Sequence, residues 1–328
     1  MKEKEINILL NKLKKDYFLF APQKMGDDLP QGQQNGVAEV DDLEDIVWDD
    51  KTPYISWKRL FLPSSEGLFD FTKKEGIKES QKKYPPIACI GMSVIDLRAL
   101  ILYEMVFAND SYYQKRRRNM IVVGYDSGQP DKYKKRRVFE INYKEEILEH
   151  LIFDIFIARQ KNGDIKIYSG SEKGQKTLED NDIKKYQHVE FAGPIPEQGQ
   201  NTHMLDIMKK LEKSHGKKIW DELAKRCIAC GKCAMICPTC FCFNLKDDAS
   251  PNNQCRSRHW GVCFYNDFSK VAGGHKELDT VRKKIFFWYY HKFVRIPKEY
   301  GIPGCVSCGR CSRSCPVDIY INETIKAL

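Results

Sequence analysis

Two runs of cysteines with the same spacing dominate the second half of the chain. Of the 13 cysteines, all but Cys89 lie after residue 226. Eight of them form the two runs, with Cys227, Cys230, Cys233 and Cys237 in the first and Cys305, Cys308, Cys311 and Cys315 in the second. In each run a glycine follows the second cysteine and a proline follows the fourth, which gives the spacing C-x2-C-x2-C-x3-C-P. A repeat this complete indicates one kind of binding loop used twice.

Thiolates at this spacing are typical ligands of iron–sulfur clusters. Three cysteines of such a run wrap one [4Fe–4S] cubane, and the fourth ligates the neighbouring cluster, as in two-cluster ferredoxins. We therefore predict cluster one on Cys227, Cys230, Cys233 and Cys315. Cluster two is predicted on Cys305, Cys308, Cys311 and Cys237. This exchange of the fourth ligand would join the two loops into one fold.

Other uses of these cysteines fit the pattern less well. A zinc ribbon needs two C-x2-C pairs rather than two complete runs of four. A disulfide framework would not need such crowding, and a reducing cytosol would not preserve it. Gly231 and Gly309 also suit loops that require positive φ, in which backbone N–H groups point at sulfur and raise the reduction potential. The sequence therefore favours two iron–sulfur clusters over zinc or free thiols.

A long insertion, residues 238–304, separates the two runs and contains further cysteines. Cys240, Cys242 and Cys263 would supply three ligands to a third cluster, with a fourth from Cys255, His259 or a partner subunit. The alternative is that they are buried free thiols, since free cysteine is among the most interior residue types. The sequence leaves both interpretations open.

The chain that must position these loops divides into two regions, which differ in the order of their expected helices and strands. Residues 1–200 are expected to form an α/β scaffold and partner-docking domain, because apolar strands alternate with helical spacing there. Helices are expected at 6–13, 97–107 (with Asp96 as N-cap) and 147–158, and strands at 85–91, 120–124, 138–143 and 165–168. Residues 201–328 are expected to form a ferredoxin-like domain with a helical insertion, including helices at 204–225 and 280–293. The predicted fold class is α+β, with residues 170–200 as the linker.

Composition narrows the classes of function. The chain has 328 residues, of which 42% are hydrophobic and 30% charged, as in globular proteins. It has no apolar stretch of the ~18–20 residues that a membrane span needs, and its charged start lacks a signal-peptide core, so we expect a cytoplasmic protein. The net charge is +9, with basic runs at 115–118 and 134–137. We interpret these runs as a solvated face or one for an acidic partner rather than a nucleic-acid site. No dinucleotide fingerprint follows Gly91 or Gly124.

Several further motifs resemble a known family. They lie at residues 237–242 (CPTCFC), 258–263 (RHWGVC), 272–275 (AGGH) and 304–311 (GCVSCGRC), with N-terminal likeness at 20–22, 56–71 and 91–124. These motifs resemble the beta subunit of cytosolic sulfhydrogenase-type [NiFe] hydrogenases and the related electron-transfer subunit of anaerobic sulfite reductase, which share a 4Fe–4S dicluster domain. The 56–71 segment favours the hydrogenase branch. Relatives usually have cysteines just after the Gly91 and Gly124 strands, and their loss here implies that an N-terminal cluster, where relatives hold one, is absent.

The resemblance implies a non-catalytic electron-transfer subunit of an oxidoreductase complex. Its partners would be a flavin subunit that binds NAD(P), the [NiFe] small and large subunits, and ferredoxin as an outside acceptor. In that picture no residue of this chain is a catalytic acid, base or nucleophile, because the chemistry belongs to the clusters. The alternatives are the electron-transfer subunit of a sulfite reductase and, less favoured, an iron–sulfur redox sensor.

Overall fold

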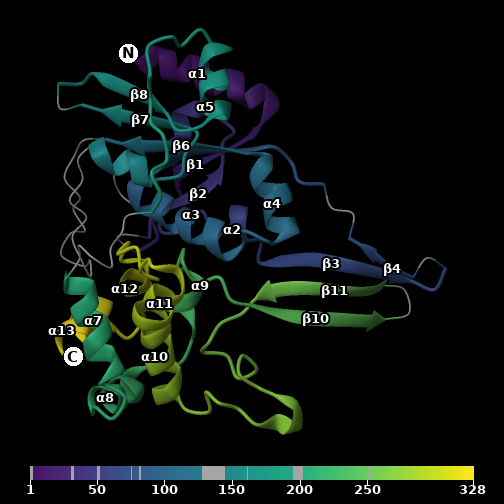
Figure 1. Cartoon of the computed structure of the whole chain (residues 1–328), viewed down its shortest axis with the longest axis vertical. Helices are drawn as coiled ribbons and strands as arrows, with labels where there is room; N and C mark the ends of the chain where they lie inside the picture. The colour runs from purple at the N-terminus through teal and green to yellow at the C-terminus, as the bar shows by residue number, and fades with distance from the viewer. Residues whose placement is uncertain are drawn as a thin grey trace.

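The protein combines a mixed β-sheet flanked by helices, a second antiparallel sheet and a helical C-terminal region (Figure 1). The computed structural model describes residues 3–30, 33–49, 52–74, 76–80, 83–127, 145–160, 162–194, 202–250 and 253–328. The α+β fold class is confirmed. No helix among these residues is long and apolar enough to cross a membrane.

Seven strands form the first sheet, in the order β2-β1-β5-β6-β7-β8-β9. The strands are β1 (Phe18–Lys24), β2 (Asn35–Glu39), β5 (Ile87–Met92), β6 (Met120–Asp126), β7 (Ile155–Arg159), β8 (Ile165–Ser169) and β9 (Gln187–His188). β1, β5, β6 and β7 run parallel, whereas β2 and β8 add antiparallel neighbours. The centre of this sheet is buried on both faces, as parallel strands require.

Helices cover both faces because alternate residues of each strand point in opposite directions. Ala88 and Ile90 of β5 belong to the core under α1 (Glu3–Asp16) and α5 (Glu172–Glu179). Cys89 and Met92 belong to the opposite core, under α2 (Lys58–Phe61) and α3 (Val94–Val106). Full burial of each large apolar side chain stabilises the fold by about 1.5–3 kcal/mol. Cys89 is therefore a packing residue at the centre of the sheet.

The second sheet joins the two halves of the sequence. Its order is β10-β11-β3-β4, all antiparallel, with β3 (Ser65–Thr72) and β4 (Gly76–Glu79) from the N-terminal half and β10 (Phe243–Ser250) and β11 (Asn253–Trp260) from the insertion. These strands project to one side of the molecule in Figure 1. The insertion is thus not entirely helical, since it begins with a hairpin that continues an N-terminal sheet.

A buried ionic network fixes this sheet against α4 (Ser111–Arg118). The carboxylate of Glu66 on β3 is 1% exposed and bonds both to Arg116 of α4 and to Arg258 of β11. Arg258 also bonds Asp110, which caps α4. Arg117 pairs with Glu104 at 2.7 Å. The basic run at 115–118 is therefore partly structural, and our interpretation of it as a solvated face is wrong for Arg116 and Arg117.

Helices make up most of the C-terminal region. They are α7 (Thr202–Glu212), α8 (Ile219–Arg226), α9 (Lys232–Met235), α10 (Val281–Tyr290), a π-helical turn (His291–Arg295), α11 (Ile296–Tyr300), α12 (Arg310–Ser314) and α13 (Ile321–Lys326). The helices of this region pack around an aromatic core that includes Trp220, Trp288, Tyr289 and Phe293. The dense aromatics of α10 are therefore mainly packing residues.

Some expected elements differ from those observed. Residues 147–158 are not a helix but a 3-10 turn (Glu145–His150) followed by strand β7, because an apolar run that looks helical in sequence is buried in the sheet instead. Ser93 caps α3, and Asp96 lies within the first turn of that helix. The linker region contains α5 and β9. The strand expected at 138–143 and the basic run at 134–137 lie outside the described residues.

Candidate metal centres

The two cysteine runs adopt the same backbone conformation. Ala229 and Ser307 occupy equivalent places and have φ of 54° and 59°. Gly231 and Gly309 follow with φ of 74° and 69°, and each begins a short helix, α9 or α12. Positive φ is uncommon for residues other than glycine, and residues in such strained conformations cluster at functional sites. The repeat in the sequence is therefore also a repeat in the structure.

This conformation turns backbone N–H groups towards sulfur. Ala229 donates to the Sγ of Cys227 and Ser307 to the Sγ of Cys305, both at 3.4 Å. Ile319 donates to the Sγ of Cys315 at 3.3 Å. Such bonds place partial positive charge beside the sulfurs, which is how a protein raises the potential of a bound iron–sulfur cluster.

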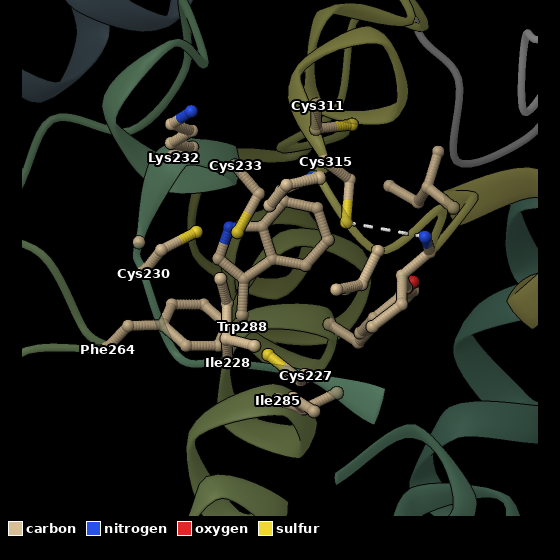
Figure 2. A pocket seen from close by; sticks show the side chains of 16 residues that line it. Cys227, Ile228, Cys230, Lys232, Cys233, Phe264, Ile285, Trp288, Cys311 and Cys315 are labelled. Atoms are coloured by element: carbon tan, nitrogen blue, oxygen red, sulfur yellow. Dashed lines mark hydrogen bonds between the residues drawn. The ribbon is translucent and has the colours of Figure 1, made fainter. Parts of the chain in front are cut away.

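The first cavity is lined by the thiols of Cys227, Cys230, Cys233 and Cys315 (Figure 2). Its apolar walls include Trp288 and Ile285 of α10, and its volume is about 50 Å³. A single water needs only ~10–15 Å³, so this space is more than a packing defect. We call it cavity one. Cys315 reaches it from the second run, as the predicted exchange of ligands requires.

The second cavity, cavity two, is lined by Cys305, Cys308 and Cys311 together with Cys237 of the first run. Its volume is about 20 Å³. Trp288 and Cys311 line both cavities and thus lie between them. Four thiols around each space fit the donor set of a [4Fe–4S] cluster. The structure brings together each predicted set of four cysteines, while ligation itself remains a prediction.

The two cavities differ in their surroundings. Cys230 is exposed at cavity one, and its neighbour Ile228 is 63% exposed. At cavity two, Val306 packs on Ile95 and Ala99 of α3. Cavity one thus lies at the edge of the molecule, whereas cavity two lies against the N-terminal region.

An ion pair ties cavity two to the N-terminal region. Arg310, between Cys308 and Cys311, is fully buried and bonds both carboxylate oxygens of Asp96, at 2.7 and 3.0 Å. It also donates to the carbonyl of Pro53 at 2.6 Å. The sequence places Asp96 at the start of a helix, but nothing in its spacing predicts this partner 214 residues away.

Two buried lysines, Lys292 and Lys58, approach the cysteines, and sequence reasoning missed both. Lys292 Nζ lies 3.0 Å from the Sγ of Cys237. Lys58 Nζ donates to the carbonyl of Met235 at 2.7 Å and lies 3.9 Å from the ring centroid of Trp260. The signal that would have found Lys292 is that it is the one lysine or arginine within the mainly apolar and aromatic segment 285–294.

Burial and these cations shift the thiol pKa values in opposite directions. Burial raises the pKa of Cys305 to about 12 and raises that of Cys311 as well. A hydrogen bond from the thiol of Cys240, together with the charge of Lys292, lowers the pKa of Cys237. Burial opposes the charge on Lys292, but the neighbouring cysteines, Cys237 first, raise its pKa overall. Cys237 is therefore the buried sulfur best stabilised as an anion by its surroundings.

Of the remaining cysteines of the insertion, Cys240, Cys242 and Cys263 interact electrostatically with Lys292 beside cavity two, whereas Cys255 lies in strand β11. The thiol of Cys240 bonds Cys237, and Cys263 is buried in the aromatic core. Cys242 lies at the open end of the β10–β11 hairpin, where its carbonyl accepts the N–H of Gly261 at 2.7 Å. Among the described residues, no three His, Cys, Asp or Glu side chains converge closely enough to hold a single metal ion. Both interpretations of these thiols, a third cluster and free thiols, stay open.

His275, the histidine of the 272–275 motif, lines neither cavity and is not buried. It is exposed and lies beside Glu277, with 3.2 Å between its Nε2 and the carboxylate.

Comparison with known proteins agrees with this site. Residues 226–319 match the model of the 4Fe–4S dicluster domain, so the chain carries such a domain. The chain is 26% identical to sulfhydrogenase 2 subunit beta of Pyrococcus furiosus, over 88% of this chain and 86% of that protein. It is also 26% identical to the F420-dependent formate dehydrogenase subunit beta of Methanocaldococcus jannaschii, over 45% of this chain and 34% of that protein. No solved structure matches. The resemblance to sulfhydrogenase beta subunits is confirmed, and the dicluster domain with this homologue supports an iron–sulfur electron-transfer subunit.

Proposed function

We propose that this chain is the iron–sulfur electron-transfer subunit of a cytoplasmic sulfhydrogenase-type [NiFe] hydrogenase. The observation that carries the proposal is the pair of cavities, each lined by one of the exchanged sets of four cysteines, with Cys311 reaching cavity one as well. The similarity to a sulfhydrogenase beta subunit over most of both chains supports the choice of complex.

In this proposal the eight cysteines of the two runs hold two [4Fe–4S] clusters. Cluster one binds in cavity one through Cys227, Cys230, Cys233 and Cys315, and cluster two binds in cavity two through Cys305, Cys308, Cys311 and Cys237. The bound clusters supply one-electron transfer. Nothing in the proposal requires a catalytic acid, base or nucleophile from the chain.

The chain's own residues contribute position, exclusion of water and access. The indole of Trp288 lies between the cavities and keeps the space between them apolar. The exposed edge at Ile228 and Cys230 is where a partner's redox group would approach cluster one. Residues 1–200 serve as a scaffold that covers cavity two, and residues 201–328 carry the clusters. Flavin, [NiFe] and ferredoxin partners follow from the proposed complex.

The proposal is tested by anaerobic affinity purification of the chain from its native host. About eight irons and about eight sulfides per chain are expected for two clusters, and about twelve of each for a third. Co-purified proteins identify the complex, because a [NiFe] large subunit indicates a hydrogenase and a sirohaem protein indicates a sulfite reductase. Colourless protein, or protein that holds zinc and no iron, would refute the proposal.

A further inference from the structure

A buried lysine links the two cysteine loops. Lys292 is 2% exposed and lies in the π-helical turn that follows α10. Its Nζ lies 3.0 Å from the Sγ of Cys237, 3.1 Å from the Oγ1 of Thr239 and 3.1 Å from the carbonyl of Gly304. A lysine ammonium has three N–H donors, so each of them has an acceptor here.

The backbone of the same residue holds the start of the second loop. The N–H of Gly304 donates to the carbonyl of Lys292 at 2.9 Å. A Cβ at position 304 would lie 2.7 Å from that carbonyl and 2.6 Å from the Cδ1 of Ile296, so only glycine allows this approach. Single π turns in helices are frequent at functional sites. Lys292 is therefore fixed between Cys237 and the residue before Cys305.

The equivalent sulfur at cavity one has a different donor. Cys315 occupies the place of Cys237 in the repeat, and its Sγ accepts the backbone N–H of Ile319 at 3.3 Å. A backbone N–H carries only a partial charge, whereas the ammonium of Lys292 carries a whole one. The repeated loops thus present different charges to the two spaces that they enclose.

Two other buried cations lie near these cysteines, and each is held by acceptors of its own: Arg310 by Asp96, and Lys58 by the carbonyls of Met235 and Cys240. Arg310 is paired with both oxygens of Asp96, so its charge is balanced within the protein. The three acceptors of Lys292 are a sulfur, a hydroxyl and a carbonyl. Burying an ammonium without an anion is costly. An anionic iron–sulfur cluster ligated by Cys237 would be the balancing charge.

We propose that Lys292 is the counter-charge of cluster two and sets that cluster's reduction potential above the value a neutral residue would give. The proposal rests on the proposed ligation of cluster two by Cys237. When the cluster accepts one electron, its charge becomes more negative by one unit, and the nearby ammonium stabilises this reduced form. In a buried site the interaction is strong because little water screens it. Lys292 acts through the ligand sulfur and takes up neither the electron nor a proton.

The test compares Lys292→Gln with Lys292→Arg and Lys284→Gln in the full chain, purified without oxygen. Lys284 is a matched control, because it is a buried lysine of the preceding helix α10 whose Nζ bonds the carbonyl of Phe264 and the side chain of Asn266 instead. Iron is quantified first. The fraction of each reduced cluster is then measured by electron paramagnetic resonance at fixed potentials, with dithionite as the electron donor.

Lys292→Gln is expected to keep both clusters and to lower the reduced-to-oxidised ratio of one of them at least tenfold, which is about 59 mV for one electron. Lys292→Arg and Lys284→Gln should leave that ratio close to the wild-type value. Loss of one cluster in Lys292→Gln, with both clusters retained in Lys292→Arg, would also support the role of the charge.

Unchanged potentials in Lys292→Gln, or an equal shift in Lys284→Gln, would overturn the inference and leave the proposed function intact. Loss of a cluster in Lys292→Arg as well as in Lys292→Gln would also overturn it, because packing rather than charge would then be required. Wild-type protein without iron would instead remove the proposed function itself.

Discussion

The two cysteine loops have the same cysteine spacing and the same backbone conformation, yet their surroundings in the protein differ. Position by position, Ile228 corresponds to Val306 and Lys232 to Arg310. Ile228 and Lys232 are exposed. Val306 and Arg310 are buried, with Val306 packed on α3 and Arg310 paired to Asp96.

This difference shows that the sequence of a cysteine loop specifies which sulfurs it offers, but not how exposed or how charged their surroundings are. The first loop faces the molecular edge, so its intervening residues are free to meet a partner. The second is enclosed by the N-terminal scaffold, so its intervening residues have become part of the core. Both loops share the spacing of the cysteines, and the residues packed around each loop determine the solvent exposure and the local charge of its cavity.

The largest expected effect concerns the exchange of the fourth ligand between the loops. The double variant Cys227→Ala with Cys315→Ala removes two proposed ligands of cluster one, so about four of about eight irons should remain. The double variant Cys227→Ala with Cys237→Ala damages both clusters and should retain fewer irons. Iron and sulfide analysis of the purified variants measures this. The opposite order would mean that each run ligates its own cluster.

The next effect concerns the charged residue at the equivalent place in each loop. Arg310→Met leaves the carboxylate of Asp96 buried with the hydroxyl of Ser93 but without a balancing cation, which typically costs roughly 3–5 kcal/mol of unfolding free energy. Lys232→Met changes an exposed side chain and should leave stability unchanged. Anaerobic urea unfolding followed by circular dichroism compares the two variants. Equal midpoints would show that the ion pair does not hold the second loop.

The smallest effect concerns the apolar residue that follows the first cysteine of each loop. Val306 is 4% exposed, so Val306→Ala should cost roughly 1.5–3 kcal/mol, from two lost methyl groups and the space they leave. Ile228→Ala should change stability by less than about 0.5 kcal/mol, as is usual at a surface. Thermal unfolding of both proteins measures the difference. A larger loss in Ile228→Ala would contradict the assignment of the exposed and enclosed loops.

The sequence could predict the local parts of this protein. Glycines at two fixed places in the cysteine runs predict positive φ, and the structure has it at Gly231 and Gly309. The apolar runs at 87–92 and 120–126 are strands because they are short, rich in β-branched residues and end at a turn. The prediction of a helix at 147–158 is wrong because an apolar pattern of this kind suits a buried strand as well as a helix, and only its place in the sheet separates the two.

By itself, the sequence predicted the two sets of four cysteines that line the cavities, because the spacing within each run limits which sulfurs can reach a common space. It also predicted that the fourth cysteine of each run lies at the cavity of the other run. Only the tertiary structure decided that β10 and β11 continue a sheet begun by β3, that Asp96 meets Arg310, and that Lys292 meets Cys237. These contacts join residues 55 to 214 positions apart, and their partners are chosen by packing and by the need to balance buried charge.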